Sequence, residues 1–108
     1  MENKNALIIQ PTDDALIVKI GGRFSGEFVF TVYKEVKRTF ENNQKNVVLD
    51  FCGSEHADSM GLGTIVAINS FVTKRGNSMK MRGVSGTFMQ LLKITNLTSI
   101  LDIEPYKE

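Results

Sequence analysis

Ser59 is the residue of this chain best placed to do chemistry. It stands between Asp58 and Met60, and two glycines, Gly61 and Gly63, follow closely. An apolar, strand-like run ends shortly before this segment and a helical pattern begins within it, so the hydroxyl is expected where a strand leads into a helix. Free backbone N–H groups at the start of a helix bind side-chain caps and favour negative charge. The position therefore suits three kinds of chemistry: nucleophilic catalysis, phosphate binding and phosphorylation.

Nucleophilic catalysis by Ser59 is the weakest of the three. The segment 57–61 approximates the strand–turn–helix elbow of hydrolases, with alanine in place of the first glycine. A catalytic serine needs a histidine that reaches it from a separate loop. The single histidine, His56, lies only three residues upstream, before the helix begins, and 108 residues leave little chain for a substrate-binding domain. We therefore do not expect a serine hydrolase.

Phosphate binding by the glycines has little support. Gly61-Leu62-Gly63 would begin a dinucleotide fingerprint, but Val66 stands where a third glycine-like residue is needed. The chain also has no Gly-Lys-Ser or Gly-Lys-Thr phosphate loop. We expect both glycines to allow close packing of the helix on the sheet, and we expect no cofactor and no metal.

Two interpretations of Ser59 remain open on local chemistry alone. Phosphorylation would add about −1.5 to −2 charges at the helix start, which would change what docks there. The helix dipole would tolerate this charge, so the fold should survive it. An ordinary serine N-cap, in contrast, would only stabilise the helix by about 1 kcal/mol. The neighbouring residues do not decide between a switch and a cap.

Strands and helices alternate along the rest of the chain. Apolar runs bounded by turn residues predict strands, and an apolar spacing of three to four residues predicts helices. We expect strands over 6–9, 15–20, 47–51, 78–82 and 98–103, and helices over 28–40, 59–74 and around 84–92. The first two strands are joined by a Pro-Thr-Asp-Asp turn and predict a hairpin. Strand–helix alternation requires crossovers, so the sequence predicts an α/β domain whose mixed sheet has four or five strands and an antiparallel N-terminal edge.

Several local features are also expected from the sequence. Ser25 is expected to cap the first helix, and residues 53–57 to form a short connection before Ser59. Cys52 is expected to be a small packing residue near a strand end. Asn96 suits a left-handed cap after the third helix, and residues 105–108 suit a frayed tail.

Composition limits the class of protein. The length of 108 residues and the hydrophobic content of 42% suit a single domain over residues 1–108. A net charge of +1 argues against a nucleic-acid-binding surface. The single cysteine excludes an internal disulfide and fits a reducing compartment. The N-terminus is polar and no apolar run approaches the roughly 18 residues of a membrane span, so we expect a cytoplasmic protein that does not insert into membranes.

Four segments between Val47 and Ile103 form a recognisable set. They are Val47–Phe51, Asp58–Gly63, Lys74–Asn77 and Leu91–Leu97. Together they resemble the STAS domain of bacterial anti-sigma factor antagonists, also called anti-anti-sigma factors. The hexapeptide Asp58–Gly63 is the most specific of the four. The N-terminal half resembles the family only in its layout of a hairpin and one helix.

The resemblance implies a partner-switching function in transcription regulation. In that family the serine after the aspartate is phosphorylated by a serine kinase of the switch-kinase type, which is also the anti-sigma factor. The unphosphorylated antagonist binds this kinase and frees the sigma factor, and a serine phosphatase resets the system. The resemblance makes Ser59 the phosphoacceptor and implies that the protein is a substrate and binding partner, not an enzyme. It implies a partner-binding surface of Asp58, Ser59, Met60, Gly61, Leu62 and Gly63, with Arg23 and Ser25.

The chain departs from the family pattern in two places that bear on the partner. Met60 replaces a small or hydroxyl residue beside Ser59. Gly22–Ser25 stands where many members have Gly-x-Leu-Asp, so an acidic residue is missing and Arg23 adds a positive charge. The alternatives to a switch are a non-switching STAS scaffold subunit of a larger regulatory or transport complex, and a small-ligand sensor, which would need a sizeable apolar pocket.

Overall fold

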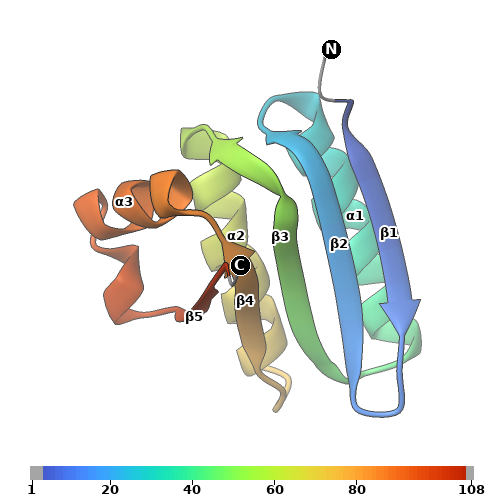
Figure 1. The fold of residues 1–108 in the computed structure, drawn as a ribbon. Coiled ribbons are helices and arrows are strands. Elements are labelled where there is room, and N and C mark those ends of the chain that lie inside the picture. Colours follow the sequence, from blue (N-terminus) through green and yellow to red (C-terminus); the bar gives the residue numbers. More distant parts are fainter. Residues whose placement is uncertain (1–3, 107–108) are drawn as a thin grey trace.

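The structure is a computed structural model and describes residues 4–106 as a sheet with helices packed on it (Figure 1). The strands are β1 (Ala6–Pro11), β2 (Ala15–Phe24), β3 (Asn46–Ala57), β4 (Met79–Val84) and β5 (Asp102–Pro105). The helices are α1 (Glu27–Asn42), α2 (Ser59–Thr73) and α3 (Gly86–Ile94), followed by the short 3₁₀ helix η1 (Leu97–Ser99). No helix among the described residues is long and apolar enough to cross a membrane.

The five strands lie in one sheet in the order β1-β2-β3-β4-β5. β1 is antiparallel to β2, and the remaining neighbours are parallel. This confirms the expected α/β fold with an antiparallel N-terminal edge. Successive crossovers move across the sheet in one direction, and crossovers of this kind are right-handed. The helices α1 and α2 therefore lie side by side on the same face of the sheet and run in the same direction (Figure 1).

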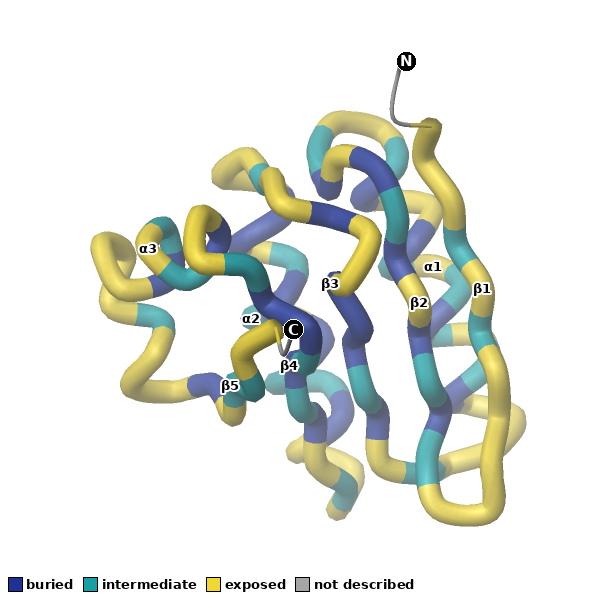
Figure 2. The backbone as a smooth tube through the Cα atoms, viewed as in Figure 1, coloured by how far each residue is buried: buried dark blue, intermediate teal, exposed yellow. Residues whose placement is uncertain are grey.

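The hydrophobic core lies between the sheet and these two helices, where the tube in Figure 2 is dark blue. Alternate residues of β2 point into it, as expected for a strand with one covered face. The buried side chains of α1 recur every three or four residues and form one stripe: Val29, Val32, Val36 and Phe40. Phe51 of β3 stacks edge-on against Phe24 of β2 at 5.5 Å and against Phe88 of α3 at 5.0 Å between ring centroids. This aromatic row ties α3 to the sheet.

The connection expected over residues 53–57 is wrong, because these residues extend β3. Gly53 pairs with Gly21, and His56 pairs with Arg23, although the register between the strands shifts along this stretch. β3 pairs with β4 only between Val47 and Asp50, so its last half is bound to β2 alone. The polar and glycine residues of this half have no apolar alternation, and the sequence pattern therefore gave no strand signal.

The C-terminal assignments need two corrections. Part of the strand expected over 98–103 is the 3₁₀ helix η1, and the strand itself begins later, at Asp102. Residues 105 and 106 are not a frayed tail: Pro105 pairs with Val84, and the Tyr106 N–H donates to the Val84 carbonyl at 2.8 Å. Residues 107 and 108 lie outside the described residues. The expected left-handed Asn96 is confirmed, with φ 62°.

Two further local expectations are wrong. Ser25 does not cap α1, because Gly26 occupies the N-cap position with φ 61° and the helix has no side-chain cap. Cys52 is not a packing residue but is exposed, since it alternates with buried Phe51 and so points to the opposite face of β3. A hydrogen bond with the Asp50 carboxylate raises the pKa of the Cys52 thiol.

Phe51→Ala should lower the free energy of unfolding by about 3–5 kcal/mol, because it removes the central ring of the aromatic row and leaves a cavity. Urea unfolding followed by circular dichroism measures this change. Phe30→Ala is the matched control: Phe30 is 56% exposed, so its loss should change stability by less than about 0.5 kcal/mol. Equal effects of the two substitutions would contradict the assigned core.

Candidate functional site

Ser59 is the first residue of α2 and is exposed at the carboxyl end of β3. The N-cap is Asp58, whose backbone is extended and whose Oδ1 accepts a hydrogen bond of 2.7 Å from the Gly61 N–H. The interpretation of Ser59 as an ordinary N-cap is therefore wrong. Among residues 4–106 the Ser59 hydroxyl has no hydrogen-bond partner, so it is free for other chemistry.

The Asp58 carboxylate also reaches a second element. Its Oδ2 accepts from the Gly26 N–H at 3.1 Å, and the Asp58 N–H lies 3.4 Å from the Phe24 carbonyl. One side chain thus joins the start of α2 to the loop between β2 and α1. The Gly61 N–H, and after it the Gly26 N–H, lower the pKa of Asp58 below its ordinary value, because both stabilise the charged carboxylate.

Gly61 lets the end of β2 lie directly against the first turn of α2. A Cβ on Gly61 would come within 2.4 Å of the Phe24 carbonyl oxygen and 2.9 Å of the Phe24 ring. The expected role of Gly61 in close packing is confirmed. For Gly63 the same expectation is wrong: it is exposed and has open space where a Cβ would stand.

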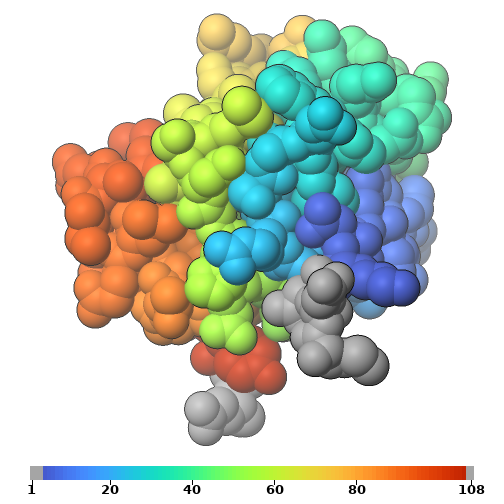
Figure 3. Space-filling view, turned by 90° about the horizontal axis from the view of Figure 1, so that it is seen from above, coloured from blue at the N-terminus to red at the C-terminus, as the bar shows by residue number. Residues whose placement is uncertain are grey.

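The parallel pairing of β2 and β3 places the two predicted parts of the site together. Arg23 lies opposite His56, and Phe24 lies opposite Ala57, so the residues that follow each strand meet at one edge of the sheet. Figure 3 looks down on this edge and shows the cyan β2–α1 loop beside the yellow-green start of α2. Arg23 is exposed and Ser25 is partly exposed.

The eight predicted partner-binding residues differ in how far they reach the surface. Asp58, Ser59, Met60, Gly63 and Arg23 are exposed, Ser25 is partly exposed, and Gly61 and Leu62 are buried. The two buried residues can support the surface but offer little contact area. Sequence reasoning missed Phe30, which is 56% exposed on α1. The available signal was that Phe30 falls outside the apolar stripe of its helix.

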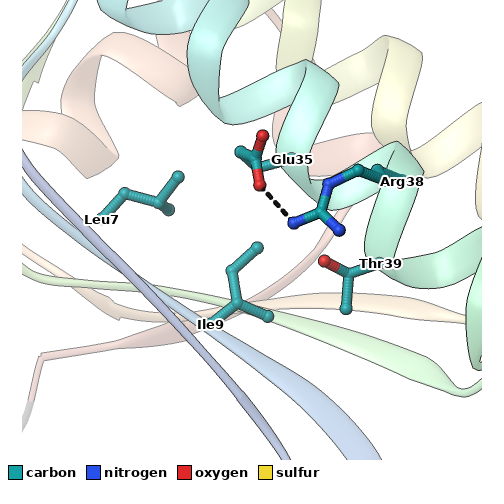
Figure 4. A pocket seen from close by; sticks show the side chains of 5 residues that line it. All are labelled: Leu7, Ile9, Glu35, Arg38 and Thr39. Carbon is teal, nitrogen blue, oxygen red and sulfur yellow. Dashed lines mark hydrogen bonds and ion pairs between the residues drawn. The ribbon is translucent and has the colours of Figure 1, made fainter.

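The geometry gives no support to hydrolysis or to small-ligand binding at Ser59. His56 is exposed in β3 and shares no hydrogen bond with Ser59 in the described part of the chain. The hollow shown in Figure 4, about 220 Å³ between β1 and α1, is lined by Leu7, Ile9 and Thr39 and by an ion pair on α1, and it does not touch Ser59. Within residues 4–106 no group of three or more His, Cys, Asp or Glu side chains could hold a metal ion.

The family model of the STAS domain matches residues 6–107. The chain belongs to the STAS domain family. A stretch of 53 residues is 38% identical to the anti-sigma-B factor antagonist of Bacillus subtilis (strain 168) and covers 49% of each chain. The chain thus matches about half the length of that relative.

Solved structures with the same fold include anti-sigma factor antagonists and a sulfate transporter family protein. A Thermotoga maritima protein assigned as an anti-sigma factor antagonist has a TM-score of 0.83 and 25% identity, over 91% of this chain and 85% of that one. The anti-sigma factor antagonist SpoIIAA in its unphosphorylated form has a TM-score of 0.78 and 12% identity, over 91% and 87%. A sulfate transporter family protein from Wolinella succinogenes has a TM-score of 0.71 and 18% identity, over 85% and 77%.

Asp58→Asn should destabilise the protein at pH 7, because the amide replaces one charged acceptor of the double hydrogen bond with an N–H₂ group. The folded pKa of Asp58 is lowered from an ordinary value of 3.8, so the carboxylate stabilises the fold above that pH and loses its effect as the pH falls through the folded pKa. The difference in unfolding free energy between wild type and variant should therefore shrink below about pH 4. Denaturant unfolding at pH 3 and pH 7 measures it, and a difference independent of pH would contradict the assigned role.

Proposed function

We propose that the protein is an anti-sigma factor antagonist whose binding is switched by phosphorylation of Ser59. The observation that carries this proposal is the exposed, uncapped Ser59 hydroxyl at the first position of a 15-residue helix in a STAS domain. The similarity to antagonists of Bacillus subtilis and Thermotoga maritima supports it. The same fold occurs in the anti-sigma factor antagonist SpoIIAA, a protein whose structure is known in its unphosphorylated form.

The geometry of the site explains how one phosphate would control docking. In the unphosphorylated state the start of α2 offers the uncharged side chains of Ser59 and Met60, which cost less to desolvate in an interface than a phosphate does. Phosphorylation adds about −1.5 to −2 charges beside the carboxylate of Asp58, and burying that charge in an interface costs free energy. The free N–H groups and the dipole of α2 tolerate the charge, so the fold is kept.

The remaining residues of the site act around this switch. Arg23, Ser25 and Met60 contact the partner, and Gly61 and Leu62 hold the surface in place from beneath. The partner is a serine kinase that is also the anti-sigma factor, and a separate serine phosphatase restores the unphosphorylated form. The chain is then a substrate and binding protein of the cytoplasm rather than an enzyme.

Incubation with the partner kinase and ATP should add one phosphate at Ser59. Tandem mass spectrometry of the intact and digested protein locates it. Ser59→Ala is the control and should take up no phosphate. Phosphate on Ser54 or Thr64 instead would contradict the assignment. Ser54 is only 1% exposed, so a kinase should not reach it in the folded protein.

Substitutions of Ser59 should separate the two states of the switch. Ser59→Ala should bind the kinase as tightly as the unphosphorylated protein, even when ATP is present. Ser59→Asp should bind at least about tenfold more weakly, which corresponds to about 1.4 kcal/mol. Isothermal titration calorimetry measures both affinities, and circular dichroism checks that both variants fold. Unchanged affinity in both variants would rule out a switch at this residue.

A non-switching scaffold subunit is the second candidate, because the same fold occurs in a sulfate transporter family protein. A scaffold would bind its assembly equally well with alanine or aspartate at position 59. The titrations of the two Ser59 variants therefore distinguish the candidates.

A further inference from the structure

The neighbouring helices α1 and α2 each expose a large apolar side chain. Phe30 of α1 is 56% exposed and Met60 of α2 is 43% exposed. A single exposed apolar residue needs no explanation, but a group of them marks an interaction surface. The relevant question is whether the two side chains lie together.

Contacts at the far end of the helices show that they share one face. Phe71 of α2 stacks on Phe40 of α1 at 5.5 Å between ring centroids, and the Lys37 ammonium lies 5.6 Å from the Phe71 ring. Met60 precedes Phe71 by about three helical turns, and Phe30 precedes Lys37 by about two, so each lies on the same side of its helix as that contact. Because α1 and α2 run side by side in the same direction (Figure 1), this helical spacing places Phe30 and Met60 on the facing sides of the two helices, near their N-terminal ends.

The α2 part of this face forms a neutral strip. The helix has no charged residue between Ser59 and Thr73, although the solvent side of a surface helix ordinarily carries charges. Its exposed positions are Ser59, Met60, Gly63, Ala67 and Thr73. Charged residues are depleted at the centres of protein interfaces, and the open space at Gly63 permits a close approach.

Cations border this neutral strip. Lys34 and Lys37 follow Phe30 along α1, and Lys74 and Arg75 follow α2; within residues 4–106 none of the four forms an ion pair. A hollow of about 390 Å³ on α1 is lined by the two lysines, by the Glu35–Arg38 ion pair, and by Tyr33 and Glu41. Three exposed carboxylates, Glu27, Glu41 and Asp58, stand against the four cations, so the border has an excess of one positive charge.

We propose that the α1 part of this face, with Phe30, Lys34 and Lys37, is a second contact surface for the partner that docks at Ser59, continuous with the first through Met60, and that the partner presents an apolar side chain flanked by carboxylates to it. The inference rests on the proposed function, because its occupant is the partner that binds Ser59. Carboxylates suit the border because opposite charges raise association rates and specificity. A second copy of the chain suits it less, because the two faces would bring like charges together.

Calorimetric and stopped-flow titration with the purified kinase that phosphorylates Ser59 tests the proposal. Phe30→Ser should weaken binding at least about tenfold. Lys34→Glu should slow association severalfold at low salt, and the effect should diminish as salt screens the charges. The matched controls lie on α3: Ile94→Ser, at a residue 78% exposed, and Lys93→Glu should each change affinity less than twofold.

The outcomes separate this inference from the proposed function. If Phe30→Ser or Lys34→Glu binds as tightly as the wild type while Ser59→Asp still binds weakly, the second surface is wrong and the switch stands. If the kinase neither phosphorylates Ser59 nor distinguishes Ser59→Asp, the proposed function itself fails. Self-association that Phe30→Ser abolishes would assign the face to a second copy and overturn the proposal.

Discussion

The site depends on one carboxylate that accepts hydrogen bonds from two elements. Asp58 binds the Gly61 N–H at the start of α2 and the Gly26 N–H at the start of α1. Helix N-termini leave backbone donors without partners, and here a single side chain satisfies donors of two helices. It also takes the cap role that Ser59 would otherwise have. The free hydroxyl of Ser59 and the position of the β2–α1 loop are therefore two consequences of the same interaction.

The parallel pairing of β2 and β3 makes this interaction possible. Two parallel strands carry their carboxyl ends to the same edge of a sheet, and the loops that follow them meet there. The second, polar half of β3 extends this pairing as far as Ala57, which lies opposite Phe24. Gly61 then allows the first turn of α2 to touch the Phe24 carbonyl, which no larger residue would permit. The site is thus a product of sheet topology as well as of the hexapeptide around Ser59.

The sequence predicted the parts of the fold that follow from apolar periodicity and turn chemistry. The stripe of α1, the opening hairpin and the left-handed Asn96 all have local causes. The second half of β3 has none, because its pairing is with a strand about thirty residues away and its residues are polar. The sequence left open whether Ser59 is a cap or a switch, because Asp and Ser are equally good caps; the structure places the cap at Asp58, whose Oδ1 accepts from the Gly61 N–H. The exposure of Phe30, in contrast, has a local cause, because Phe30 falls outside the apolar stripe of α1.

A switch at Ser59 requires that phosphate change binding without changing the fold. The most direct measurement is the affinity of the partner kinase for the unphosphorylated protein and for the same protein phosphorylated stoichiometrically at Ser59, with NMR spectra of both forms. The account predicts binding weakened at least about tenfold by phosphorylation, with chemical-shift changes confined to the start of α2 and the β2–α1 loop. Equal affinities of the two forms, or loss of binding through unfolding, would contradict it.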